Sequence, residues 1–188
     1  MVLSNNQIIC AKLLGIAGLF LSGSGPLIAD ITHTNMGSYS FEGMVVVTPC
    51  QISPGSEKVP VNFEQVSVKE LYTAGKSKPL PFSINLINCN ISVFKAVTVT
   101  FNGTENINLP DHLAINAKSE ASGIGIGLLN ENNTEIKLNQ PSLAQDLANN
   151  DTEIKFKAYI EVEPEALSNK AITYGNFYST AYYTLEYQ

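Results

Sequence analysis

The sequence predicts an all-β protein, organised as a β-sandwich. It contains about eight short runs rich in β-branched and aromatic residues, separated by Gly, Pro, Asn, Asp and Ser, which is typical of a sandwich. Helical periodicity is almost absent, and residues 143–148 form the only helix-leaning stretch. The chain also ends in a long alternating segment, residues 175–188, which makes the C-terminus part of the core.

Residues 1–29 are predicted to be a secretory signal peptide. Lys12 precedes a short apolar stretch, residues 13–21, and a Gly/Ser/Pro segment leads to a small residue at Ala29. A membrane anchor is the alternative interpretation, but this stretch is too short for a bilayer core of about 30 Å. Cleavage after Ala29 removes Cys10 with the signal and leaves about 159 residues, enough for one domain.

The charge of the chain argues against nucleic-acid and phosphate binding. Removing Lys12 from 11 basic residues leaves 10 against 17 acidic ones, a net charge of −7. Every basic residue is a lysine, whereas phosphate and nucleic-acid sites depend on arginine and on positive patches. We therefore expect no nucleic-acid partner.

Two cysteines remain after cleavage, Cys50 and Cys89. An even number of cysteines in an exported chain favours a disulfide, and closing the intervening loop of 39 positions would stabilise the fold by about 4 kcal/mol. Two free buried thiols are the alternative.

The first half of the domain contains four predicted strands. Residues 41–48 lead into the first cysteine. Residues 59–68 alternate but shift phase midway, as at a bulge or bend. Residues 81–89 alternate cleanly, and residues 96–101 follow with Val and Phe in phase.

The second half starts with a short apolar run, residues 113–115, and a glycine-rich strand, residues 123–129. Its glycines are wrongly spaced for a phosphate loop, so they predict a backbone packed closely against a neighbour. A turn at residues 130–134 and a return strand at residues 135–138 predict a hairpin.

The last two strands are residues 152–162 and the C-terminal segment, joined by a loop at residues 164–174. A strand as long as the C-terminal segment needs partners on both edges, because a free edge invites aggregation. Its inward face carries small or apolar residues: Phe177, Ser179, Ala181, Tyr183, Leu185 and Tyr187.

Residues that carry chemistry are sparse. His33 and His112 lack metal-ligand neighbours at the right spacing, and no Gly-x-Ser-x-Gly motif exposes a nucleophile. Glu161, Glu163 and Glu165 crowd a strand end and predict a solvated face. We expect no enzymatic activity, metal or cofactor.

Several segments together resemble one known family. These are Gly37–Cys50, with Gly, Phe, Gly and Val before the cysteine; Phe82–Cys89; Val99–Phe101; Ala121–Ile126; and the C-terminal positions Gly175, Ala181, Tyr183, Leu185 and Tyr187. In these motifs the chain resembles the subunits of chaperone–usher pili (fimbriae) of Gram-negative bacteria, and the resemblance covers essentially the whole mature chain.

The resemblance implies an incomplete immunoglobulin-like sandwich, residues 42–188, that lacks its last strand and is completed by a donor strand in trans. The C-terminal strand, with Gln188 at its end, would line the resulting groove. A periplasmic chaperone would fill this groove during export, and its basic residues would anchor the terminal carboxylate. An outer-membrane usher and neighbouring pilus subunits are the other implied partners, and the implied location is the cell-surface fimbrium.

The resemblance also implies that residues 30–41 donate a strand to a neighbouring subunit. A frayed terminus is the alternative. His33 and Asn35 are more polar than donor residues of the family usually are, whereas Gly37 fits a position that needs a small residue. This segment alternates independently of the resemblance, at Ile31, His33, Asn35, Gly37, Tyr39 and Phe41.

We expect a structural subunit, minor or adaptor-like. A receptor-binding adhesin is the alternative, but the pilin pattern starts too near the mature N-terminus for a preceding lectin domain. A chain-terminating or anchoring subunit is a third possibility, because it would differ only in the depth of one pocket.

Overall fold

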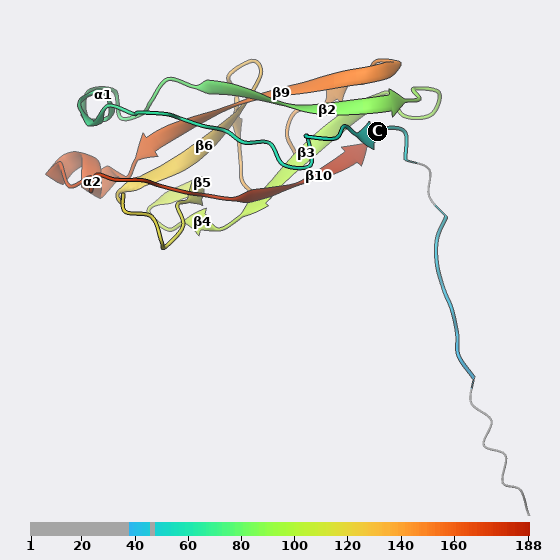
Figure 1. The fold of residues 1–188 in the computed structure, drawn as a ribbon, viewed down its shortest axis with the longest axis horizontal. Helices are drawn as coiled ribbons and strands as arrows, with labels where there is room; N and C mark the ends of the chain where they lie inside the picture. The colour runs from blue at the N-terminus through green and yellow to red at the C-terminus, as the bar shows by residue number, and fades with distance from the viewer. Residues whose placement is uncertain (1–37, 46–47) are drawn as a thin grey trace, which may run out of the picture. The chain divides into compact units, whose positions relative to one another are not determined.

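The computed structural model describes residues 38–45 and 48–188 (Figure 1). The chain divides into two units, Met1–Met44 and Val45–Gln188. The predicted signal peptide and most of the predicted donor segment lie outside the described residues. In the first unit, residues 38–44 are exposed and belong to no strand.

The second unit is built from two antiparallel sheets (Figure 1). The first has the order β1-β2-β9-β6-β5-β4, with β7 paired to β6, and the second has the order β10-β3-β8. The first sheet comprises β1 (Gln51–Ile52), β2 (Leu80–Cys89), β4 (Glu105–Asn106), β5 (Leu109–Ala114), β6 (Ile124–Asn130), β7 (Glu135–Ile136) and β9 (Asn150–Val162). The second comprises β3 (Ala96–Gly103), β8 (Gln145–Asp146) and β10 (Ala181–Tyr187). The all-β prediction is confirmed.

The main core lies between the two sheets, because alternate residues of each strand face the other sheet. Ile84 of β2, Phe156 of β9 and Val99 of β3 are almost completely buried in it. Phe101 meets Phe156 edge to face, with ring centroids 5.0 Å apart. The segments predicted to alternate, residues 81–89 and 152–162, therefore supply most of the core side chains that come from the first sheet.

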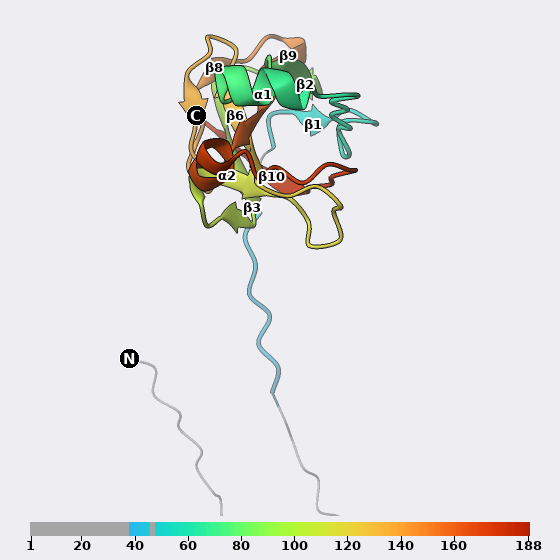
Figure 2. The ribbon, with the colours of Figure 1, turned by 90° about the vertical axis from the view of Figure 1, so that its left-hand side faces the viewer.

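Two short helices, α1 (Val68–Ala74) and α2 (Pro164–Asn169), lie at the same end of this unit (Figures 1 and 2). The prediction of a strand at residues 59–68 was wrong, because residues 59–67 belong to no strand and Val68 begins α1. The predicted loop at residues 164–174 instead begins with α2. Tertiary packing explains both, since Leu71 and Ala166 are buried in a second apolar cluster. Neither helix, nor any other in the described ranges, is long and apolar enough to cross a membrane.

Two other strand predictions need correction. Residues 41–45 and 48 are not in a strand, and the first strand begins only at Gln51. The ladder of the C-terminal strand begins at Ala181, so residues 175–180 precede it. The helix-leaning residues 143–148 instead contain β8.

The predicted close approach at the glycine-rich strand is confirmed at Gly127. It lies opposite Tyr159 in the β6–β9 ladder, and a Cβ atom built there would overlap the tyrosine ring. Burial and the nearby Glu161 and Glu135 carboxylates raise the pKa of Tyr159, so its hydroxyl stays protonated.

We expect Gly127→Ala to lower the free energy of unfolding by about 1–3 kcal/mol, because the Tyr159 ring must move in a packed site. Urea denaturation monitored by circular dichroism measures this. Gly43→Ala is the matched control: a Cβ there meets nothing within 4 Å, so stability should change by less than about 0.5 kcal/mol. Equal effects of the two substitutions would contradict the steric explanation.

Candidate functional site: an open groove beside the last strand

The last strand, β10, has one edge without a strand partner among the described residues. Its other edge pairs with β3 over its full length, from Ala181 opposite Gly103 to Tyr187 opposite Val97. The inward residues of β10 are only partly buried, although they pack against the main core. An edge strand with a half-covered apolar face is a site for another strand to pair.

A second segment, residues 57–63, runs between β2 and β10 (Figure 1). It lines the same groove as residues 177–183. Val59, Val61 and Phe63 are partly buried and alternate with exposed residues, as in a strand. Within the described part of the chain, however, residues 57–63 form no backbone hydrogen bond with any other segment. The predicted alternation of residues 59–63 is therefore present, but no strand pairs with this segment in the described part of the chain.

The groove between these two segments is apolar and has a volume of about 790 Å³. We call residues 57–63 the first lip and residues 177–183 the second lip. The floor consists of core side chains from both sheets: Phe82, Ile84, Phe101, Leu113, Ile126, Leu128 and Ala158. Neither the first lip nor this floor was predicted from the sequence. The unpaired alternation of residues 59–63 was the signal that could have located the first lip.

The predicted groove residues divide into two sets. Phe177, Ser179, Ala181 and Tyr183 line the groove. Leu185 and Tyr187, further along β10, also face inward, but they pack on the core and do not line the groove. Gly175 lies outside the lining too and has a φ of 142°, packed against Glu120.

The C-terminal residue, Gln188, is held by the beginning of β3. Its backbone oxygen accepts hydrogen bonds from the Lys95 and Ala96 amides, at 2.7 and 3.1 Å. Its own amide donates to the Ala96 carbonyl at 2.8 Å. The chain end is thus an ordered continuation of β10.

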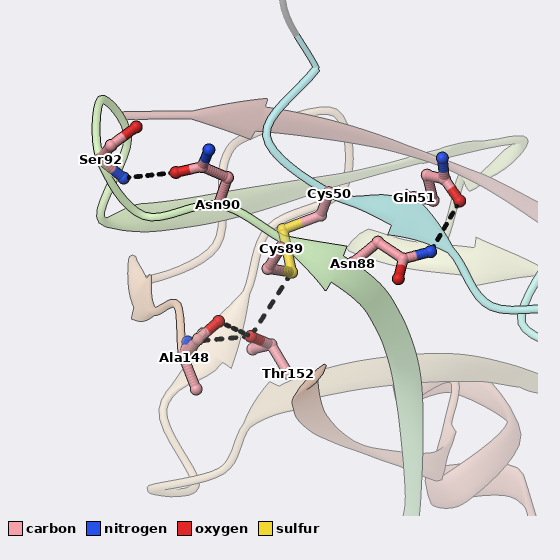
Figure 3. The surroundings of a disulfide bond; sticks show 8 residues. All are labelled: Cys50, Gln51, Asn88, Cys89, Asn90, Ser92, Ala148 and Thr152. Atoms are coloured by element: carbon pink, nitrogen blue, oxygen red, sulfur yellow. Dashed lines mark hydrogen bonds between the residues drawn. A yellow bond between two sulfur atoms is a disulfide. The ribbon is translucent and has the colours of Figure 1, made fainter. Parts of the chain in front are cut away.

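The predicted disulfide joins Cys50, just before β1, to Cys89 at the end of β2 (Figure 3). Both cysteines are buried in the main core. The Thr152 hydroxyl of β9 donates to the Cys89 sulfur at 3.7 Å and accepts from the Ala148 amide at 2.9 Å. The bridge therefore fixes the chain where it enters the sandwich, shortly before the first lip.

Two of the three carboxylates predicted to form a solvated face contact other side chains. The carboxylate oxygen Oε2 of Glu161 lies 3.1 Å from Nε2 of His112, within hydrogen-bond distance. Glu163 accepts hydrogen bonds from the side-chain amides of Asn106 and Asn108, at 2.9 and 2.8 Å. Of the predicted set, Glu165 is exposed, whereas Glu161 and Glu163 are partly buried. In the described ranges, no group of three His, Cys, Asp or Glu residues has the arrangement of a metal site.

Of the predicted donor residues, only Tyr39 and Phe41 lie in the described part. Their side chains are 88% and 92% exposed. Ile31, His33, Asn35 and Gly37 lie outside the described residues, and the donor role of the segment stays a prediction.

Comparison with known proteins shows which family shares the sequence and fold of this chain. A family model described as "Fimbrial protein" matches residues 39–188. The putative minor fimbrial subunit PmfF of Proteus mirabilis is 37% identical over 90% of this chain and 93% of its own. The fimbrial adapter PapK of Escherichia coli is 32% identical, over 79% of this chain and 86% of its own. A solved chaperone–usher pilus structure superposes with a TM-score of 0.64 at 26% identity, covering 82% of this chain and 96% of its chain.

The class defined by the fold and site is an immunoglobulin-like sandwich with an open groove along its last strand. Within that class, the chain belongs to the fimbrial protein family.

Proposed function

We propose that this chain is a structural subunit of a surface pilus that polymerises by donor-strand exchange, without enzymatic activity. The observation that carries the proposal is the free edge of β10 beside an apolar groove floored by core residues. An added strand would satisfy the backbone groups of this edge and cover the exposed core, the two gains of β-strand addition. Both lips already have the period-two geometry that such a strand would meet.

The occupant that we propose is the N-terminal segment of a neighbouring subunit, equivalent to residues 30–41 here. Tyr39 and Phe41 are exposed large apolar side chains ahead of the compact unit, and burial in a neighbour's groove would remove them from water. During export a periplasmic chaperone would occupy the same groove, and the usher would exchange it for the donor strand.

A minor or adaptor-like position in the fibre is supported by the relatives. PmfF is described as a putative minor fimbrial subunit and PapK as a fimbrial adapter. To find the position, the subunit is mixed with peptides that copy residues 30–41 and the corresponding segments of the other subunits of its pilus. The peptide that binds most tightly identifies the donating neighbour. If none binds, the proposed function is wrong.

We expect Ala181→Leu to weaken binding of that donor peptide roughly tenfold or more, because the larger side chain fills groove volume that the donor needs. The empty variant should be at least as stable as the wild type, since the leucine covers exposed core. Isothermal titration and urea denaturation measure the two effects. Thr184→Leu is the matched control, because Thr184 is exposed on the opposite face of β10 and lies outside the groove. Unchanged donor affinity in Ala181→Leu would contradict the groove assignment.

A further inference from the structure

One edge of β6 is shared by two short strands, and a cluster of polar side chains lies where they meet. The other edge of β6 pairs with β9 along its whole length. On the shared edge, β5 pairs with residues 125 and 126 and β7 pairs with residues 128 and 129, with Gly127 between them. Residues 110–112 of β5 therefore have no ladder with β6, and a cavity of about 50 Å³ lies at this fork.

The side chain of His112 spans the fork from β5 to β9. Its Nε2 atom lies 3.2 Å from the Tyr159 hydroxyl oxygen and 3.1 Å from Oε2 of Glu161. Its Nδ1 atom lies 3.0 Å from the Pro110 carbonyl oxygen. The side chains of His112 and Glu161 are 13% and 31% exposed, so this pair is better shielded from solvent than a surface ion pair. His112 thus ties the hairpin formed by β4 and β5 to the long strand β9.

The acceptors around the ring suit the protonated form of the imidazole. A backbone carbonyl and an ionised carboxylate can only accept hydrogen bonds, and here they lie at different nitrogens of the His112 ring. A neutral imidazole has one N–H and satisfies one of these acceptors, whereas the imidazolium has two and satisfies both. Burial and the nearby Glu161 and Glu135 carboxylates raise the pKa of Tyr159, so its hydroxyl remains a donor in either case.

Histidine is the side chain in this cluster that ordinarily titrates near neutral pH. The charged groups on the elements packed against His112, besides Glu161, are Glu135 and Lys137 of β7, Asp111 of β5, Glu105 of β4, Glu163 just after β9 and Lys76 before β2. Lys137 pairs with Asp111 at 3.2 Å, and the Lys76 ammonium lies 5.4 Å from the centroid of the Tyr159 ring. Carboxylates and lysines do not ordinarily titrate between about pH 5.5 and about pH 8, whereas histidine does.

We infer that His112 is a pH-sensitive clamp, which holds the β4–β5 hairpin on the first sheet more firmly when its ring is protonated. Because the folded contacts favour the imidazolium, this stabilisation is present at acidic pH and is lost as the pH rises and the ring releases its proton. The inference does not depend on the proposed function. It has a consequence for the groove, however, because Leu113, the next residue of β5, belongs to the groove floor.

The test measures hydrogen-exchange protection of the amides of the β4–β5 hairpin in the refolded chain at about pH 5.5 and about pH 8, on either side of the ordinary histidine pKa. Protection is corrected for the intrinsic pH dependence of exchange. In the wild type it should be roughly two- to tenfold greater at the lower pH, as expected for a partly shielded ion pair with its hydrogen bond. His112→Gln keeps a polar side chain that does not titrate, so its protection should be equal at the two pH values.

Two further variants separate the clamp from other causes of pH dependence. Glu161→Gln keeps the size of the side chain but can donate to a neutral ring nitrogen, so the difference between the two pH values should shrink or disappear. His33→Gln is the matched control, because it makes the same substitution at the only other histidine of the sequence and should leave the difference unchanged. Equal protection at both pH values in the wild type, or a difference that survives in His112→Gln, would overturn the clamp. Loss of the difference in His33→Gln would assign it to the other histidine and overturn the clamp as well.

Discussion

Deletion of residues 30–41 should reduce assembly of subunits beyond this one in the fibre roughly tenfold or more, because the deleted chain has no strand to donate. Its own groove is formed entirely by residues after position 56, so it should still accept a strand. The measurement is the amount and subunit composition of pili released from cells that carry the deletion.

The control for this experiment is the binding of the donor peptide to the groove of the deleted chain. The deleted chain should bind its donor peptide with the affinity of the full chain, which shows that the fold and groove are intact. If the deleted chain accepted the peptide and the fibre still extended normally, the donor assignment of residues 30–41 would be refuted.

Replacing both cysteines, by Cys50→Ala with Cys89→Ala, should lower the free energy of unfolding by about 4 kcal/mol on the chain-entropy model for the 39-residue separation. The bridge holds the entry of the chain to the end of β2, so the first lip depends on it. Urea denaturation of the empty subunit measures the loss.

Reductant provides the internal control for this prediction. It should destabilise the wild type to about the level of the double variant and leave the double variant unchanged. A loss below about 1 kcal/mol would mean that the main core alone holds the entry segment in place.

The sequence predicted best those strands whose two faces differ strongly in polarity. Residues 81–89 and 152–162 lie side by side as β2 and β9, and the glycine-rich run forms β6. Period-two alternation indicates such strands directly, because one face meets the core and the other meets water or a polar layer. The C-terminal strand was recognised for the same reason, together with the residues that line the second lip.

The remaining features depend on contacts that no local pattern encodes. Helix α1 forms because Leu71 reaches an apolar cluster, although the preceding residues alternate like a strand. The first lip alternates but pairs with nothing in the described chain, so its function appears only when β10 is seen across from it. The hydrogen bond from the Tyr183 hydroxyl to the Ser56 carbonyl joins residues too far apart in the sequence for any spacing rule.

The free edge of β10 has a mechanical consequence. A strand that pairs with its residues, Ala181–Tyr187, runs along β10, so a pull on that strand along its length loads the ladder in shear. In shear, the backbone hydrogen bonds of the ladder resist together, whereas a pull across the ladder would break them one after another. Separation under tension would also expose core side chains to water, and its rate would be set by the barrier to this local unfolding. A fibre joined in this way would fail by the slow unfolding of a subunit rather than by the dissociation of two surfaces.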